Sequence, residues 1–286
     1  MIHPNYLAGA AMLTLLVGCA TLPTPEERAH SADKLAAEHY WAAQTLITNP
    51  FQLRAYVPAA AAAETLAVYI EGDGLAWLSS TRPSTDPTPR APVGLQLALA
   101  QPTGAAAYLA RPCQFIATQS ICSHDYWTDA RFAPEVVKSL DQAIDQLKAR
   151  VGAQQLILVG YSGGGTLALL LAARRDDVAR VITVAGNLNP RAWTTHHRLQ
   201  PLKRSLNPAD QQKALASTRQ QHLAGGRDRI VPAALASAFN DAYTSGTPSR
   251  VYLLPEHDHA CCWARDWPSL WLKLQQDAQA STQNQP

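Results

Sequence analysis

The sequence predicts an α/β domain with a mainly parallel central sheet, helices on both faces and a short cap insertion. From about residue 64, short apolar runs alternate with longer segments of helical periodicity, which is typical of βαβ units. Each apolar run ends near Gly, Pro or a charged turn, as buried parallel strands do. We expect strands at Leu66–Ile70, Ala105–Ala110, Leu156–Val159, Val181–Ala185, Gln221–Ala224 and Val251–Leu254, and a leading hairpin within residues 44–58.

Three segments predict helices that pack against this sheet. Pro134 begins a helix with its apolar residues on one face, and Gly152 follows the end of that helix. Thr166–Ala173 is apolar all round, which indicates a helix buried in the core. Near the C-terminus, large apolar residues recur at the spacing of one helix face: Trp263, Trp267, Leu270, Trp271 and Leu274. We expect these tryptophans to belong to the core rather than to a ligand platform.

Length and charge limit the class of protein. The 286 residues fit one domain of ordinary size, and 24 Lys and Arg nearly cancel 22 Asp and Glu. This balance gives no electrostatic footprint for nucleic acid, so we expect no nucleic-acid partner. We expect a main domain at residues 44–280, preceded by a tether and N-terminal helix at 19–43. Within that leading segment, the prolines and charges of residues 21–32 predict the tether.

The first residues have the features of a targeting segment. Tyr6–Val17 is apolar but too short to span a bilayer, and it leads into Gly18-Cys19. The ending Leu16-Val17-Gly18-Cys19 resembles the lipobox of bacterial lipoproteins, which implies a signal peptide at residues 1–18 and lipidation of Cys19. An uncleaved anchor or an ordinary signal peptide is the alternative. Ala20 in place of Asp resembles Gram-negative lipoproteins sent to the outer membrane. The resemblance implies a protein of the cell envelope, lipid-anchored and facing the periplasm or the exterior.

Four cysteines remain beyond Cys19, an even number in a compartment that permits disulfides. Cys113 and Cys122 lie close in sequence across a polar loop, so we expect a disulfide between them. Cys261 and Cys262 are adjacent, and three interpretations stay open: a vicinal disulfide, two thiols, or simple packing residues.

A short motif in the middle of the chain predicts a nucleophile. The apolar run Leu156–Val159 leads into Gly160-Tyr161-Ser162-Gly163-Gly164 and then into a helix, which is the strand–turn–helix context of a nucleophile elbow. The serine of such an elbow sits on a tight, strained turn with its hydroxyl exposed, and glycines let strand and helix approach closely. We therefore expect any larger residue at 160 or 164 to clash. The alternative is a glycine-rich turn without activity.

Together with other motifs, this elbow resembles the α/β-hydrolase superfamily over about residues 64–275. More narrowly, the chain resembles bacterial lipoproteins of that fold. The motifs that carry this resemblance are Ile70-Glu71-Gly72-Asp73-Gly74, Ala110-Arg111-Pro112-Cys113-Gln114, Gly160–Gly165 and Cys261-Cys262-Trp263. The resemblance implies the fold and a Ser-His-Asp triad, and it leaves the substrate open. The early loop lacks the His-Gly-Gly of many lipases, which weakens a direct analogy to those enzymes.

The family's order of Ser, acid and His indicates the other members of the triad. Gly225–Pro232 follows a strand and resembles the family's acid turn, which makes Asp228 the candidate acid. The last strand leads into two candidate bases, His257 and His259. We favour His259, because His257 follows the strand too closely to reach back, and we interpret His257 as a loop or supporting residue. Asp258 is expected to be a turn residue.

An acyl transfer also needs N–H donors for the developing oxyanion. In the family, one donor comes from the residue after the nucleophile, which here is Gly163, and the second comes from the loop after an early strand. That loop contains Gly72 and Asp73, and both stay candidates. The alternative is a tight Asp-Gly turn with no donor role.

The segment between two later strands predicts the cap. Residues of about 187–217 contain few consecutive apolar positions, which favours a short polar cap over a large apolar lid. His196 and His197 lie there, without a carboxylate or a further histidine at supporting spacing. We therefore interpret them as solvated or substrate-facing residues rather than as metal ligands.

These observations favour a serine hydrolase that acts on an acyl bond, most simply a carboxylic ester, and needs no cofactor or metal. The expected partners are a small-molecule or lipid-like acyl substrate and, through the lipid anchor, a membrane. A peptidase, a thioesterase or an acyltransferase with the same triad is an alternative. So is a non-catalytic, surface-anchored binding protein on a hydrolase fold. The oligomeric state stays open.

Overall fold

The computed structural model describes residues 22–59, 62–116, 119–243 and 248–283. The expected signal peptide at residues 1–18 and the expected lipidation site Cys19 lie outside these ranges. Among the helices within these ranges, none is both long and apolar enough to cross a membrane.

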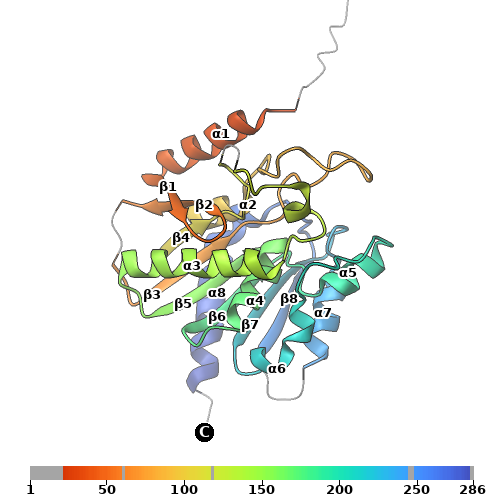
Figure 1. The fold of residues 1–286 in the computed structure, drawn as a ribbon. Helices are drawn as coiled ribbons and strands as arrows, with labels where there is room; N and C mark the ends of the chain where they lie inside the picture. Colours follow the sequence, from red (N-terminus) through yellow and green to blue (C-terminus); the bar gives the residue numbers. More distant parts are fainter. Residues whose placement is uncertain (1–21, 60–61, 117–118, 244–247, 284–286) are drawn as a thin grey trace, which may run out of the picture.

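A sheet of eight strands in the order β1-β2-β4-β3-β5-β6-β7-β8 forms the centre of the fold (Figure 1). The hairpin β1–β2 is antiparallel, β2 pairs antiparallel with β4, and the neighbours from β4 to β8 are parallel. The strands are β1 (Trp41–Ile47), β2 (Gln52–Pro58), β3 (Thr65–Ile70), β4 (Ala105–Leu109), β5 (Gln155–Tyr161), β6 (Val178–Val184), β7 (Arg219–Gly225) and β8 (Ser249–Leu254). The predicted strands, the leading hairpin and the mainly parallel sheet are confirmed.

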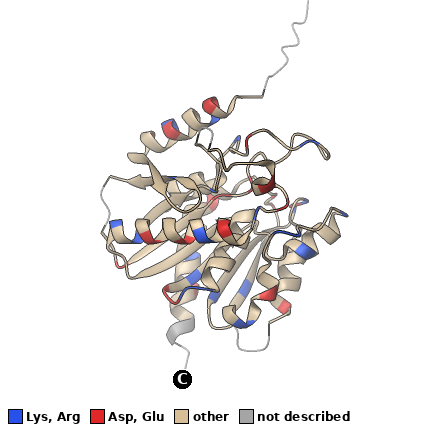
Figure 2. Ribbon diagram, viewed as in Figure 1, with Lys and Arg blue, Asp and Glu red and all other residues tan. Residues whose placement is uncertain are grey.

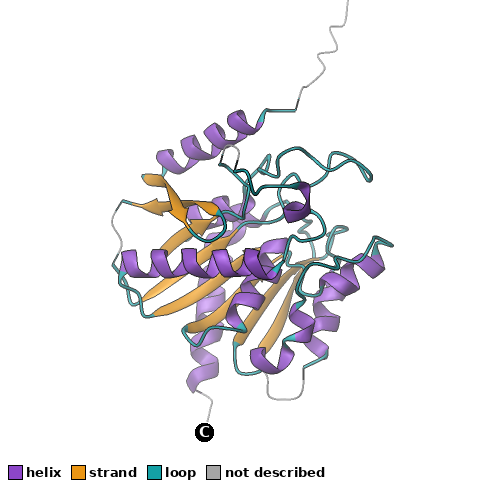
Figure 3. Ribbon diagram, viewed as in Figure 1, coloured by secondary structure: helices purple, strands orange, loops and turns teal. Residues whose placement is uncertain are grey.

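Helices cover both faces of this sheet, as predicted (Figure 3). Successive residues of a strand point to opposite faces, and in β3 Val68 belongs to one core cluster while Tyr69 belongs to the other. The first cluster includes α3, α4 and α7, and the second includes α1, α2 and α8. The α-helices are α1 (Pro25–Glu38), α2 (Val93–Leu99), α3 (Pro134–Val151), α4 (Gly163–Ala172), α5 (Pro190–His196), α6 (Gln212–Leu215), α7 (Ala233–Asp241) and α8 (Trp263–Gln283).

The helix boundaries follow the local chemistry of the chain. Pro134 opens α3, and Gly152 ends it in the left-handed conformation with φ 74°. Figure 2 shows charged residues of both signs along α3, whose apolar face is buried against the sheet. Every residue of α4 is buried, as its apolar composition predicts. The tryptophans of α8 are core residues, and Trp267 Nε1 donates to Tyr69 Oη at 2.9 Å.

The N-terminal helix corrects the tether that we expected at residues 21–32. The helix α1 begins at Pro25, where Thr24 forms a capping box with Glu27. It docks on the domain through buried alanines and through Arg28, whose Nη1 donates to Thr88 O at 2.6 Å. The tether prediction is therefore wrong from Pro25 onward, because these prolines and charges start and anchor a helix instead of extending the chain.

The predicted cap segment contains short elements rather than a large lid. Between β6 and β7 the chain forms α5, a single turn of 3-10 helix at Pro208–Asp210, and α6. Within α5, Trp193 donates through Nε1 to Ile230 O at 2.6 Å, which ties this segment to the loop after β7.

Candidate active site

The turn between β5 and α4 holds Ser162 in a strained conformation. Its backbone has φ 50° and ψ −120°, a region that residues with a side chain rarely occupy. The Ser162 N–H donates to Val184 O at 3.0 Å, so the neighbouring strand β6 holds the turn in place. Strain that the surrounding structure maintains is typical of functional turns.

The glycines around this turn are required by close packing. A Cβ on Gly160 would lie 2.5 Å from Gly165 N and closer still to Gly164 O. A Cβ on Gly164 would lie 2.6 Å from Glu71 O and closer still to Ile70 O. Real Cβ atoms essentially never come within 3.0 Å of such atoms, so the predicted clashes at 160 and 164 are confirmed.

The structure brings the three predicted triad residues together from three loops. His259, after β8, has Nε2 3.0 Å from Ser162 Oγ and Nδ1 2.8 Å from Asp228 Oδ2. Asp228, after β7, has a fully buried side chain, and its Oδ1 accepts from the N–H groups of Ile230 and Val231 at 2.8 Å each. These bonds fix the carboxylate, so that its second oxygen faces the imidazole.

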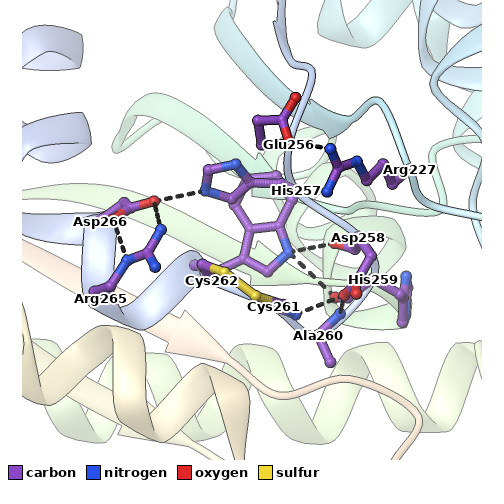
Figure 4. The surroundings of a disulfide bond; sticks show 11 residues. Arg227, Glu256, His257, Asp258, His259, Ala260, Cys261, Cys262, Arg265 and Asp266 are labelled. Atoms are coloured by element: carbon purple, nitrogen blue, oxygen red, sulfur yellow. Dashed lines mark hydrogen bonds and ion pairs between the residues drawn. A yellow bond between two sulfur atoms is a disulfide. The ribbon is translucent and has the colours of Figure 1, made fainter.

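The other candidate base lies away from this chain of hydrogen bonds. The ring of His257 packs on Trp263 with 4.5 Å between centroids, and its Nε2 lies 3.1 Å from Asp266 Oδ2 (Figure 4). Asp258 is a turn residue, as expected. Its Oδ1 accepts from the N–H groups of Ala260 at 2.8 Å and Cys261 at 2.7 Å. The preference for His259 over His257 agrees with this geometry.

A hydrogen bond that the sequence did not reveal separates Gly72 from the other two candidate oxyanion donors. The Gly72 N–H donates to the buried Glu71 carboxylate at 2.8 Å, which removes Gly72 from the candidate donors and corrects that expectation. In the described part of the chain, no hydrogen bond engages the N–H of Gly163 or of Asp73. A Cβ on Gly163 would collide with Asp73 Oδ1, so the early loop lies directly against the nucleophile turn. Asp73 and Gly163 are the donors that this arrangement favours.

A buried ion cluster that sequence reasoning missed holds this loop. The two oxygens of Asp73 accept from the guanidinium groups of Arg111 and Arg131. Burial acts to raise the pKa of Asp73, but the two arginines outweigh it and hold that pKa below its ordinary value. Arg111 belongs to the motif Ala110–Gln114, but its pairing with Asp73 is visible only in the folded structure.

Glu71 is a second carboxyl that the sequence did not single out. Its Oε1 accepts from Gly72 N and from Gly94 N at 3.2 Å, and its Oε2 accepts from Tyr108 Oη at 3.1 Å. Burial raises the pKa of this carboxyl, and the hydrogen bonds oppose that shift. Glu71 therefore joins the loop after β3 to the first turn of α2.

Ser162 and His259 open on a cleft of about 480 Å³. Leu75, Trp77, Trp193, Ile230 and Val231 contribute apolar wall, and Arg90 and Arg131 also line it. A second cavity of about 510 Å³ beside α1 includes no triad residue.

The structure also places the remaining cysteines and the cap histidines. Cys113 and Cys122 form a disulfide of 2.05 Å with 5.7 Å between Cα atoms, which confirms that prediction. Cys261 and Cys262 form a vicinal disulfide, which decides among the open alternatives. His197 Nε2 lies 2.8 Å from Ile230 O. Within the described ranges, no group of three His, Cys, Asp or Glu residues is placed to hold a metal ion.

Comparison with known proteins identifies the architecture. A family model described as the alpha/beta hydrolase fold matches residues 111–229, a range that includes Ser162 and Asp228 and ends before His259. The chain has the α/β-hydrolase fold. No match is found among curated proteins.

Solved structures of the α/β-hydrolase fold align with most of the chain at low identity. Est1E from Butyrivibrio proteoclasticus is 15% identical with a TM-score of 0.56, and the match covers 83% of this chain and 99% of Est1E. XC6422 from Xanthomonas campestris, described as an α/β serine hydrolase without a lid, is 17% identical with a TM-score of 0.53, covering 86% of this chain and 97% of that one. The Pyrococcus furiosus esterase Pf2001 is 9% identical with a TM-score of 0.58, covering 83% and 91%.

Proposed function

We propose that the protein is a serine hydrolase that cleaves a carboxylic ester. The observation that carries this proposal is the continuous chain of hydrogen bonds from Ser162 Oγ through both nitrogens of His259 to Asp228. Serine is a weak nucleophile by itself, and this arrangement supplies both a base and a group that orients the base. XC6422 is described as a serine hydrolase and Pf2001 as an esterase, and this supports a hydrolase of the same class.

The geometry supports a two-step mechanism. Ser162 Oγ attacks the ester carbonyl carbon while His259 Nε2 takes the hydroxyl proton, and Asp228 stabilises the imidazolium that forms. The N–H groups of Gly163 and Asp73 stabilise the negative oxygen of the tetrahedral intermediate. The intermediate collapses to an acyl-serine, and the alcohol leaves with the proton from His259. Water then attacks the acyl-serine, gives a proton to His259, and releases the carboxylic acid as Ser162 regains its proton.

The experiment that tests this function is labelling with a fluorophosphonate probe, followed by hydrolysis of 4-nitrophenyl esters. Ser162→Ala should abolish labelling and lower kcat by at least about a thousandfold, because the nucleophile is gone. Ser80→Ala is the matched control, since Ser80 is exposed and lies outside the cleft. His259→Ala should be nearly inactive while His257→Ala keeps substantial activity. Undiminished labelling or turnover in Ser162→Ala would refute the proposal.

For the N-terminal segment, we propose that Cys19 is lipidated and anchors the protein to the outer membrane, facing the periplasm or the exterior. The lipobox-like ending at Leu16–Cys19 supports this, and α1 begins at Pro25, so the link between anchor and domain is short. Metabolic labelling with a palmitate analogue tests it. Label should appear in the wild type and be absent from Cys19→Ser, and an unlabelled wild type that stays soluble on fractionation would contradict the anchor.

A further inference from the structure

The cleft in front of Ser162 contains two arginines that the triad does not use. Arg90, between β3 and α2, is exposed and forms no hydrogen bond or ion pair with the residues that the structure describes. Arg131 has a side chain that is only 6% exposed. Its Nε donates to Thr128 O at 2.7 Å and its Nη1 to Asp73, while Nη2 has no partner in the described ranges. Both guanidinium groups thus keep donors available to a bound molecule.

The carboxylates of the same cleft are already paired with donors of the protein. Both oxygens of Asp73 are engaged by arginines, and those of Glu71 by two N–H groups and a tyrosine hydroxyl. Asp228 lies behind His259 with both oxygens occupied. Among the ionic groups of the cleft in the described ranges, the two arginines are the ones that keep unpaired hydrogen-bonding atoms.

The apolar walls suit the rest of such a molecule. Trp77 and Trp193 line the cleft together with Ile230 and offer apolar surface to a bound group. Hydrogen bonds from a guanidinium to a carboxylate are charge-assisted and among the stronger ones in proteins.

We propose that the natural substrate is an ester that carries a carboxylate, bound by Arg90 and Arg131 while its apolar part lies against Trp77 and Trp193. This inference rests on the proposed ester hydrolysis and adds the chemical class of the substrate. The carboxylate replaces water on Arg90 and on the Nη2 of Arg131, and it takes no part in bond breaking.

Two matched pairs of esters test the proposal on either side of the scissile bond. The first pair is mono-4-nitrophenyl adipate and 4-nitrophenyl hexanoate, which differ by a carboxylate in place of a methyl group at the end of the acyl chain. The second is 4-carboxyphenyl acetate and phenyl acetate. In at least one pair, the wild type should prefer the anionic ester, and Arg90→Gln should lower the ratio of kcat/KM for the anionic over the neutral ester about tenfold. The matched control is Arg82→Gln, because Arg82 is exposed in the same loop and does not line the cleft.

A binding measurement keeps this inference separate from the catalytic proposal. In Ser162→Ala, calorimetry should show tighter binding of adipic acid monoanilide than of hexananilide, and Arg90→Gln added to this variant should remove the difference. These amides test the arginines even if the protein does not hydrolyse esters. No anionic preference in either ester pair, or equal ratios for Arg90→Gln and Arg82→Gln together with equal binding of the two anilides, would overturn the proposal.

A separate observation concerns the loop that carries His259. The disulfide Cys261–Cys262 lies where this loop meets α8, and Figure 4 shows it beside Asp258 and His259. Cys261 is exposed and Cys262 partly so. Both cysteines lie outside the two core clusters.

Hydrogen bonds connect the disulfide to the imidazole through the backbone. Asp258 accepts from Cys261 N at 2.7 Å and donates through its own N–H to Cys261 O at 3.2 Å. The carbonyl of His259 accepts from Tyr161 Oη at 3.0 Å and from Trp263 Nε1 at 3.2 Å. The turn that presents His259 is thus fixed on one side by β5 and on the other by the linked cysteines.

We infer that the Cys261–Cys262 bond is a positioning element that holds His259 in line with Ser162. In Cys261→Ser/Cys262→Ser, kcat per active site should fall about tenfold or more while KM stays within about twofold, because a displaced base affects the chemical step and not the binding walls. Active sites are counted by fluorophosphonate titration, and thermal unfolding verifies the fold. Arg265→Ala, an exposed neighbour, is the control. Wild-type kcat in the double variant, or a rise in KM that matches the loss of kcat/KM, would overturn the inference.

Discussion

Gly164→Ala is expected to damage catalysis more than stability. The new Cβ would lie 2.6 Å from Glu71 O and closer still to Ile70 O, both of which are backbone atoms at the start of the loop that carries Asp73. The neighbouring Gly165 is a graded control in the same helix. Its added Cβ would meet Gly186 Cα at 3.0 Å and Thr183 side-chain atoms at 3.4 Å, contacts that small shifts relieve.

Both substitutions gain helix propensity, but only Gly164→Ala has to displace a backbone carbonyl. Alanine favours a helix over glycine by about 0.8–1 kcal/mol at either position. At Gly164, displacing a backbone carbonyl in a packed core costs about 1–3 kcal/mol, so the unfolding free energy should fall by up to about 2 kcal/mol. The same displacement separates the N–H groups of Asp73 and Gly163, and a misplacement approaching 1 Å costs on the order of a hundredfold in rate.

Denaturant unfolding and steady-state hydrolysis of a 4-nitrophenyl ester measure the two effects side by side. We expect Gly164→Ala to remain folded with kcat reduced about a hundredfold, and Gly165→Ala to keep kcat within a few fold of the wild type. A folded Gly164→Ala with wild-type kcat would refute the reasoning, because the close approach of α4 to the loop after β3 would then have no catalytic consequence.

Asp228→Asn should lower kcat about 10³- to 10⁴-fold at nearly constant KM, because an amide cannot hold the imidazole in the tautomer that accepts the serine proton. Steady-state kinetics measure this effect, and a change confined to KM would count against it. Replacing Cys113 and Cys122 by Ser should lower the unfolding free energy by about 2–3 kcal/mol, since the bridge closes a loop with a sequence separation of 9; urea unfolding tests this, and an equally stable variant would contradict it. The hydrogen bond from Arg175 lowers the pKa of Asp177 from 3.8 to about 2, so its stabilising contribution is complete above pH 3.8 and is lost as pH falls toward 2. Asp177→Asn should therefore be less stable than the wild type at pH 7, with the difference shrinking between pH 3.8 and 2, and equal unfolding midpoints at pH 7 would exclude the effect.

Much of the site was predictable because its members stand in short, ordered motifs. Ser162 follows a buried strand, Asp228 follows the next strand but one, and His259 follows the last, so parallel strands bring all three to the same edge of the sheet. The Cys113–Cys122 bridge was predictable for the related reason that both cysteines belong to one local loop. The choice of His259 over His257 needed only the distance of each from the strand end.

One error arose where two segments meet, and the other arose within a single loop. Prolines and charges near Pro25 have the composition of a tether, and only the docking of Arg28 against Thr88 shows that they begin a packed helix. Gly72 and Asp73 are equivalent in a loop sequence, whereas the Glu71 side chain engages the N–H of the first and leaves that of the second unengaged among the described residues.

The sequence alone determined the strands, three of the packed helices and one disulfide, because periodicity and turn chemistry are properties of neighbouring residues. The family resemblance supplied the order of the three candidate triad residues. Tertiary structure alone decided how the oxyanion loop is held and what the cleft offers to a substrate. Asp73 is 38 positions from Arg111 and 58 from Arg131, and their pairing depends on how strands, turns and loops pack in three dimensions. Long-range charge pairing leaves no period in the chain, so it becomes visible only when the fold has assembled.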